Sequence, residues 1–282
     1  MKPANCIERD GFWDVAKLLL MILVVYGHLI SFWIGEALNL AAYNSIYFFH
    51  MPLFVFISGR FSVIKDKQRY QSRLLSYCET YLVFQFLYTI FYGILCRQWS
   101  LDSLLVPEGI MWYLLSLVFW RAGVFFFSDY IKLYPAKVML ISFLLSLAIG
   151  FIPVNDVLSL QRTFSFLPFF ILGYYSNDIE VKSLLSRIPI FPSFLVFGLV
   201  ICINYQYVDE NVKYIHYGNE SFLNDSFPMW SMMLFRLLFL FMGFILSVLF
   251  LRIIMSIDEK FKRIRVFAQS GGGILPIYTT CL

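Results

Sequence analysis

The sequence predicts an all-α protein, a polytopic bundle of transmembrane helices with about nine spans. Of the 282 residues, 60% are hydrophobic and only 14% are charged, whereas soluble domains are about half apolar and about a quarter charged. The mean hydropathy is +0.74. Apolar runs recur along the chain at lengths close to the roughly 20 residues that a helix needs to cross a bilayer. We therefore expect one integral membrane domain over residues 1–282, which excludes a water-soluble enzyme fold.

Eight apolar runs are the expected helices. The sixth is short and contains Pro168, and the first lacks a signal-peptide cleavage site, so we expect it to be a retained helix. A ninth run begins near Ser270 and reaches Leu282. We expect it to be an incomplete span and expect a tenth span to be missing. The eight runs cover residues 15–34, 43–63, 74–96, 110–127, 137–153, 164–176, 189–207 and 230–251.

Lysine and arginine predict the orientation. With the N-terminus in the cytoplasm, sixteen of these residues fall in inside segments and three in outside loops, namely Arg97, Arg162 and Lys213. The remaining three of the 22 are Lys17, Arg121 and Arg236, which lie within or at the edge of spans. An excess of basic residues in cytoplasmic loops is typical of membrane proteins. We expect a multi-pass protein of the cell (inner or plasma) membrane with a cytoplasmic N-terminus.

Several other classes of protein are disfavoured. The five cysteines show no CxxC spacing, which predicts free thiols and no metal site. The net charge of +4 is too small to indicate a nucleic-acid partner. The chain contains neither the GxSxG nucleophile motif nor the HExxH zinc motif.

Ionisable side chains inside the first two runs are the strongest candidates for a functional site, because such groups are costly in a bilayer. Lys17 and His28 are eleven residues apart, so on a helix they share one face about 16 Å apart. Asp14 lies one turn below Lys17, and His50 of the second run falls at a depth similar to that of His28. The alternatives are that Lys17 extends to the inner interface and that each histidine is a packing residue.

Basic residues elsewhere divide into two kinds. Arg69 and Arg73 are spaced i, i+4 at the expected cytoplasmic mouth, where they suit either phosphates or anionic lipid headgroups. Arg121 is expected to extend to the inner interface, and Arg236 is expected to anchor its helix at the outer interface.

The first two runs resemble the opening of the acyltransferase family 3 membrane proteins, in particular the fucose 4-O-acetylase-like branch. The family pattern is a basic residue, ten residues and a histidine, here Lys17 and His28, followed by an FHMPLF…SG block, here Phe49–Phe54 and Ser58-Gly59. Weaker matches follow in order along nearly the whole chain: Arg69 and Arg73, Met111-Trp112-Tyr113-Leu114, FLPFFILGYY ending at Tyr175, and the late segment GGGILPIY.

This resemblance implies transfer of an acyl group, usually acetyl, from cytoplasmic acyl-CoA to a sugar hydroxyl of lipopolysaccharide, capsule or exopolysaccharide. Acetyl-CoA is then the acyl donor and co-substrate, and the expected partners are this donor, the glycan acceptor and the lipid bilayer. His28 is the expected base, because imidazole titrates at about pH 6.5. His50 is expected to orient or assist, Asp14 to hold Lys17, and Lys17, Arg69 and Arg73 to bind the donor.

Two departures from the family pattern accompany this resemblance. Cys281 falls where the family has a late histidine, and the basic residue of the first motif is lysine where arginine is commoner. Two other functions stay open on the sequence alone. One is a transporter of a glycan or lipid precursor, which favours an inverted repeat that we do not find. The other is a non-catalytic membrane subunit of a glycan assembly complex.

Overall fold

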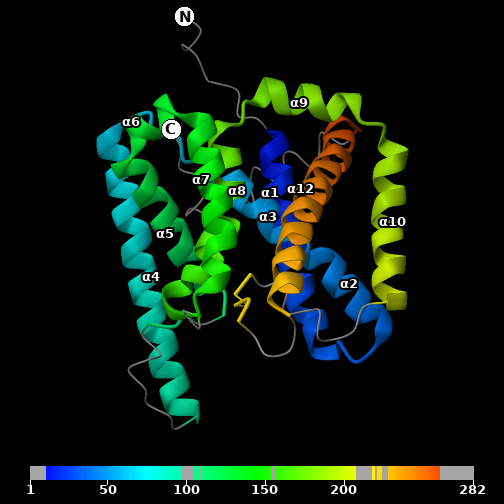
Figure 1. Cartoon of the computed structure of the whole chain (residues 1–282), viewed down its shortest axis with the longest axis horizontal. Helices are drawn as coiled ribbons and strands as arrows, with labels where there is room; N and C mark the ends of the chain where they lie inside the picture. The colour runs from blue at the N-terminus through cyan, green and yellow to red at the C-terminus, as the bar shows by residue number, and fades with distance from the viewer. Residues whose placement is uncertain are drawn as a thin grey trace, which may run out of the picture. The chain divides into compact units, whose positions relative to one another are not determined.

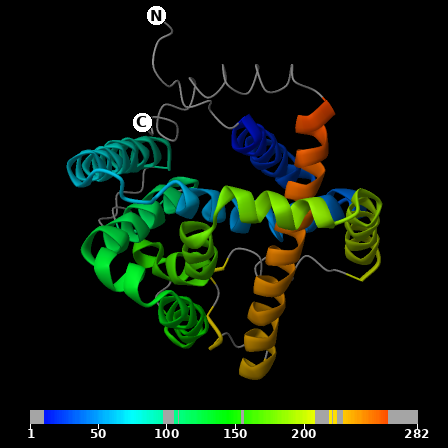
Figure 2. The same ribbon diagram turned by 90° about the horizontal axis from the view of Figure 1, so that it is seen from above.

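The structure is a computed structural model that describes residues 11–96, 105–107, 109–153, 156–207, 218–219, 221–223 and 228–260. Within these ranges every regular element is a helix. The expected ninth run lies outside the described residues. The helices and their order along the chain are drawn in Figures 1 and 2. The chain divides into two compact units. The first comprises Met1–His50, Asn177–Val208 and Ile245–Leu282, and the second comprises Met51–Ser176 and Asp209–Phe244.

The first unit is built around the N-terminal helix. Here α2 packs against both α1 and α10, and aromatic rings of α3's preceding turn, α10 and α12 meet at Phe49, Phe197 and Phe250. Its helices are α1 (Gly11–Ile30), α2 (Ala37–Tyr47), α9 (Asp178–Arg187), α10 (Ile190–Tyr207) and the later part of α12 (Met229–Lys260).

The second unit is a bundle in which α5 contacts α4 and α8, and α8 contacts α7. Figure 1 shows these helices running lengthwise beside one another. Its helices are α3 (His50–Arg60, from its second residue), α4 (Lys67–Cys96), α5 (Met111–Phe126), α6 (Ser128–Leu133), α7 (Pro135–Ala148), α8 (Leu160–Tyr175) and the first part of α12.

All eight expected helices of the described chain are present near the expected bounds. Five helical segments are long and apolar enough to cross a membrane, namely Gly11–Trp33, Ala37–Arg60, Lys67–Leu95, Ile190–Tyr207 and Met229–Ile257. Shorter apolar helices cover Met111–Phe126 and Pro135–Phe151. Helices α6 and α9 were not predicted, because both are too short and too polar to stand out as apolar runs. The start of α9 is capped by Asn177, whose side chain accepts a hydrogen bond from the Ile179 amide at 3.0 Å.

The second expected helix consists of two pieces. It is interrupted at Phe48 and Phe49, between α2 and α3. Pro52 explains the break, because it has no amide hydrogen to offer the carbonyl of residue 48 and its ring would collide with that carbonyl.

Two glycines let α3 and α8 approach closely in the second unit. A Cβ atom added to Gly59 would overlap with the backbone carbonyl of Phe170, and one added to Gly173 would overlap with that of Phe56. Small residues at helix interfaces permit such backbone contact in membrane proteins. Arg60 extends the contact, since its Nη1 donates to the Ser176 carbonyl at 2.6 Å.

The prediction that Arg121 extends to the membrane interface is wrong. Arg121 is buried, with 5% of its surface exposed. Its guanidinium lies 5.0 Å from the ring centroids of both Tyr70 and Tyr77, and it donates to the Tyr77 hydroxyl at 3.0 Å and to the Phe61 carbonyl at 3.3 Å. Two aromatic faces and two oxygens thus replace the water that an exposed guanidinium would bind.

Arg236 is likewise buried and is not an interface anchor. Its exposed fraction is 4%. Its Nη1 donates to the Ser165 hydroxyl and to the Ser146 carbonyl, and its guanidinium lies 5.4 Å from the Phe222 ring centroid. Arg236 therefore ties α12 to α7 and α8 inside the second unit.

Candidate functional site

The start of α1 carries a largely buried ion pair. Lys17 Nζ lies 2.9 Å from Asp14 Oδ1, and the two side chains are 15% and 5% exposed. Their i, i+3 spacing places them on neighbouring turns of the same helix face. Asp14 is in the first turn of α1, where a carboxylate also interacts favourably with the helix dipole. The sequence-predicted partner of Lys17 is therefore in contact with it.

A short helix covers this end of α1. Trp13 Nε1 donates to the Asp178 carboxylate at 2.6 Å, and the Lys182 ammonium lies 5.5 Å from the Phe12 ring centroid. Both Phe12 and Trp13 are almost completely buried. Together these contacts exclude water from the turn that holds Asp14, which is why the carboxylate and the ammonium pair with each other.

His28 lies on the same continuous helix as Lys17, three turns further along. Its neighbour Gly27 faces α2, where an added Cβ would lie 3.1 Å from a ring carbon of Tyr47. Ser31 Oγ donates to the His28 carbonyl at 2.7 Å. Unlike Lys17, His28 is exposed in the structure. His28 is two residues from the end of α1, and its neighbour Gly27 is the residue that packs against α2.

His50 is buried, with 3% of its surface exposed. Its Nδ1 lies 2.8 Å from the Ile46 carbonyl. A carbonyl can only accept, so Nδ1 carries the proton and Nε2 is the acceptor of the neutral ring. The ring centroids of His50 and Tyr47 lie 4.6 Å apart, with the two rings edge-to-face.

Tyr47 packs against His50 and was not a candidate in the sequence. Its ring lies beside Gly27, the neighbour of His28, stacks on Tyr43 at 4.0 Å between ring centroids, and meets His50 edge-on. The sequence contained one indication of this contact, because an aromatic residue three positions before His50 lies one helical turn away on nearly the same face.

Arg69 and Arg73 lie in the first two turns of α4, in the second unit. Arg69 is 68% exposed, and its Nε lies 3.6 Å from Asp66 Oδ2. Asp66 also begins the helix, since its Oδ1 accepts from the amides of Gln68 at 2.9 Å and Arg69 at 3.1 Å. The candidate residues therefore form two groups: Asp14, Lys17, His28 and His50 in the first unit, and Arg69 and Arg73 in the second.

Metal ligation finds no support in the part of the chain that the structure describes. No group of three or more His, Cys, Asp or Glu side chains there could hold a metal ion. The chemistry available at the site is that of imidazoles, a lysine–aspartate pair and arginines. These groups move protons and bind anions.

Together, the long apolar helices and the ionisable groups on α1 and at the start of α3 define a multi-pass membrane protein with polar side chains inside its spans. Residues 10–268 match the family Acyl_transf_3, described as an acyltransferase domain. The chain therefore belongs to this acyltransferase family.

A stretch of 64 residues is 47% identical to the nodulation protein NolL of Mesorhizobium japonicum (strain LMG 29417 / CECT 9101 / MAFF 303099). This stretch covers 21% of the chain and 17% of that relative. No solved structure matches the chain.

Proposed function

We propose that the protein is a membrane O-acyltransferase that moves an acetyl group from cytoplasmic acetyl-CoA to a hydroxyl of an envelope or cell-surface glycan. The observation that carries the proposal is the placement of Lys17 and His28 on one unbroken helix, with Asp14 paired to Lys17. This is the arrangement on which the resemblance to the family rests, and the match over residues 10–268 supports it.

In the proposed reaction, His28 takes the proton of the acceptor hydroxyl as the oxygen attacks the thioester carbonyl. The new ester C–O bond forms, the C–S bond breaks, and the proton passes from the imidazole to the leaving thiolate. The products are the O-acetyl sugar and CoA. Exposure of His28 to its surroundings suits this role, because the base must reach two substrates within hydrogen-bond distance.

His50 is proposed to assist. Its Nδ1 is occupied by the Ile46 carbonyl, which leaves Nε2 as the acceptor of a neutral ring, and Tyr47 packs edge-on against that ring. A ring fixed in this way orients a neighbouring group better than a mobile one.

The donor is proposed to bind through its phosphates and to extend its thioester toward His28. Arg69 and Arg73 are one helical turn apart and Arg69 is exposed, as a phosphate-binding pair requires. Lys17 lies about 16 Å along the axis from His28, a span that the pantetheine arm of CoA can bridge. Asp14 holds the ammonium of Lys17 in place.

The test is acetyl transfer by purified protein in lipid nanodiscs, with radiolabelled acetyl-CoA and a fucose-containing oligosaccharide. The variant His28→Ala is expected to lower kcat by about 100-fold or more, as loss of a general base does. Tyr26→Phe is a matched control on the same helix, exposed and two residues away. Normal transfer by folded His28→Ala protein would refute the role of His28, and transfer that does not need acetyl-CoA would refute the donor.

A further inference from the structure

The second unit has two chemically different ends. Tyr70, near the start of α4, contacts Arg121 in the later part of α5. At the other end, the amide of Leu158 donates to the Leu105 carbonyl at 2.7 Å, and the amide of Phe222 donates to the Gly150 carbonyl at 2.6 Å. Arg69 and Arg73 lie at the first end. The connections that precede α5 and α8 meet at the second.

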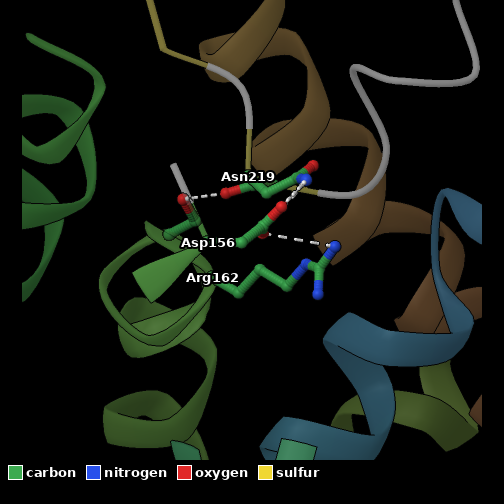
Figure 3. Close-up of polar contacts among 5 residues, drawn as sticks. Asp156, Arg162 and Asn219 are labelled. Carbon is green, nitrogen blue, oxygen red and sulfur yellow. Dashed lines mark hydrogen bonds and ion pairs between the residues drawn. The ribbon is translucent and has the colours of Figure 1, made fainter. Parts of the chain in front are cut away.

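A polar cluster occupies this second end (Figure 3). The side-chain amide nitrogen of Asn219 (Nδ2) donates to both carboxylate oxygens of Asp156, at 3.2 and 3.1 Å. Arg162, two residues into α8, lies 3.6 Å from Asp156 Oδ1 through its Nη2. The three side chains come from the connection before α8, from α8 itself and from residues that precede α12, so the fold brings them together from distant parts of the sequence.

Trp112 fixes the arginine from the other side. The Arg162 guanidinium lies 5.3 Å from the Trp112 ring centroid, and that ring stacks on Phe166 at 5.6 Å. The side chain of Arg162 is 17% exposed. A guanidinium held by an indole face and a carboxylate has a defined orientation, and this in turn fixes the carboxylate of Asp156.

The backbone of this connection is held in an unusual conformation. Asp156, Leu158 and Ser159 have φ values of 61°, 51° and 52°, in the left-handed region that residues other than glycine rarely adopt. Such strain persists only where the surroundings maintain it. The contacts of Asp156 with Arg162 and Asn219 and the Leu158–Leu105 hydrogen bond provide that support.

The cluster presents hydrogen-bond acceptors without net charge. The Asp156 side chain is 37% exposed, so part of its carboxylate reaches solvent. The Asn219 side-chain oxygen is buried and has no hydrogen-bond partner among the residues that the structure describes. Because Arg162 neutralises Asp156, the cluster does not attract an anion. Carboxylate and amide oxygens beside one another suit ligands that donate hydrogen bonds through hydroxyl groups.

We propose that Asp156 and Asn219, positioned by Arg162 and Trp112, bind the hydroxyl groups of a neutral acceptor sugar. This inference rests on the proposed function and adds to it the place and the class of acceptor. The inference places the acceptor site in the second unit, at the end that lies away from Arg69 and Arg73.

The experiment measures KM for both substrates and binding of the acceptor alone, using purified protein in nanodiscs. The probes are a neutral fucose-containing oligosaccharide and an oligosaccharide of equal length that ends in glucuronate. Asp156→Asn is expected to raise the KM for the neutral acceptor by about tenfold, the loss that one charge-assisted hydrogen bond gives. The KM for acetyl-CoA is expected to stay the same, and the melting temperature is expected to fall only by the small amount that a partly exposed ion pair contributes.

The same variant leaves the Arg162 charge without its counterion, so we expect the glucuronate acceptor to gain relative to the neutral one. The matched control is Asp129→Asn, which alters an exposed acidic residue of α6. This control should change neither the KM for the neutral acceptor nor the KM for the glucuronate acceptor. An unchanged KM for the neutral acceptor would overturn the proposal. Equal changes in the KM values of both substrates, together with a large fall in melting temperature, would also overturn it, because they would show that Asp156 only stabilises the fold.

Calorimetric titration with the neutral oligosaccharide, without acetyl-CoA, separates this proposal from the proposed function. Binding that weakens about tenfold in Asp156→Asn supports the acceptor site even if wild-type protein transfers no acetyl group. Transfer by wild-type protein together with binding that does not depend on Asp156 supports the function and overturns the site.

Discussion

Two ion pairs with the same spacing differ in almost every physical respect. Asp14 and Lys17 on α1 are 2.9 Å apart and nearly buried, whereas Asp66 and Arg69 at the start of α4 are 3.6 Å apart and more than half exposed. The first pair is covered by Phe12, Trp13 and α9. The second faces solvent. Spacing of i, i+3 therefore does not determine whether a cation is fixed in place or available to a ligand. The packing of other side chains around the pair determines its exposure.

The largest effect is expected at the buried pair. Asp14→Asn leaves the Lys17 ammonium without its counterion in a water-poor environment, and removal of one partner of a buried pair typically destabilises by about 3 kcal/mol. Thermal unfolding in a fixed detergent, followed by tryptophan fluorescence, measures the change. The double variant Asp14→Ala/Lys17→Met, in which no charge remains, should recover much of the lost stability. A loss below about 1 kcal/mol in the single variant would mean that Lys17 behaves as a surface residue.

An intermediate effect is expected for Arg69 and Arg73, and it should appear in the binding of acetyl-CoA. Arg69→Gln combined with Arg73→Gln removes two charges that we assign to donor phosphates, so the KM for acetyl-CoA should rise about tenfold, equivalent to about 1.4 kcal/mol. Steady-state kinetics at several salt concentrations measures it, because the wild-type KM should rise with salt more steeply than that of the variant. Equal KM values would assign the two arginines to lipid headgroups or to topology.

The smallest effect is expected at Asp66. Asp66→Asn removes the charge of the exposed pair but keeps an oxygen that can accept from the Gln68 and Arg69 amides, as the cap of α4 requires. The melting temperature should therefore change by less than the equivalent of about 0.5 kcal/mol. A larger loss, close to that of Asp14→Asn, would remove the contrast between the two pairs.

Helix positions were predictable because they depend on local composition. The apolar run expected at 110–127 corresponds to α5 at Met111–Phe126, and the one expected at 189–207 corresponds to α10 at Ile190–Tyr207. The Asp14–Lys17 contact was predictable for the same reason, since both residues lie on one helix. The cap at Asn177, with acidic residues in the turn after it, was a readable signal for α9 that an apolar-run criterion ignores.

The environments of the buried arginines were not predictable, because their partners are distant in the sequence. Arg121 lies between two tyrosines that are 51 and 44 positions away, and Arg236 binds oxygens 71 and 90 positions away. The same limit applies to Asp156 and Asn219, which are 63 positions apart. Residue spacing predicts contacts within one helix, whereas these contacts join segments that are far apart in the sequence.

The close approach of α3 and α8 has a consequence for how the gene tolerates mutation. At Gly59 and Gly173 the nearest obstacle is backbone, and backbone cannot turn aside as a side chain can. In a saturation library screened only for protein abundance, both codons should accept glycine and reject even alanine. Such a screen would reveal this helix crossing in cells without any assay of acyl transfer.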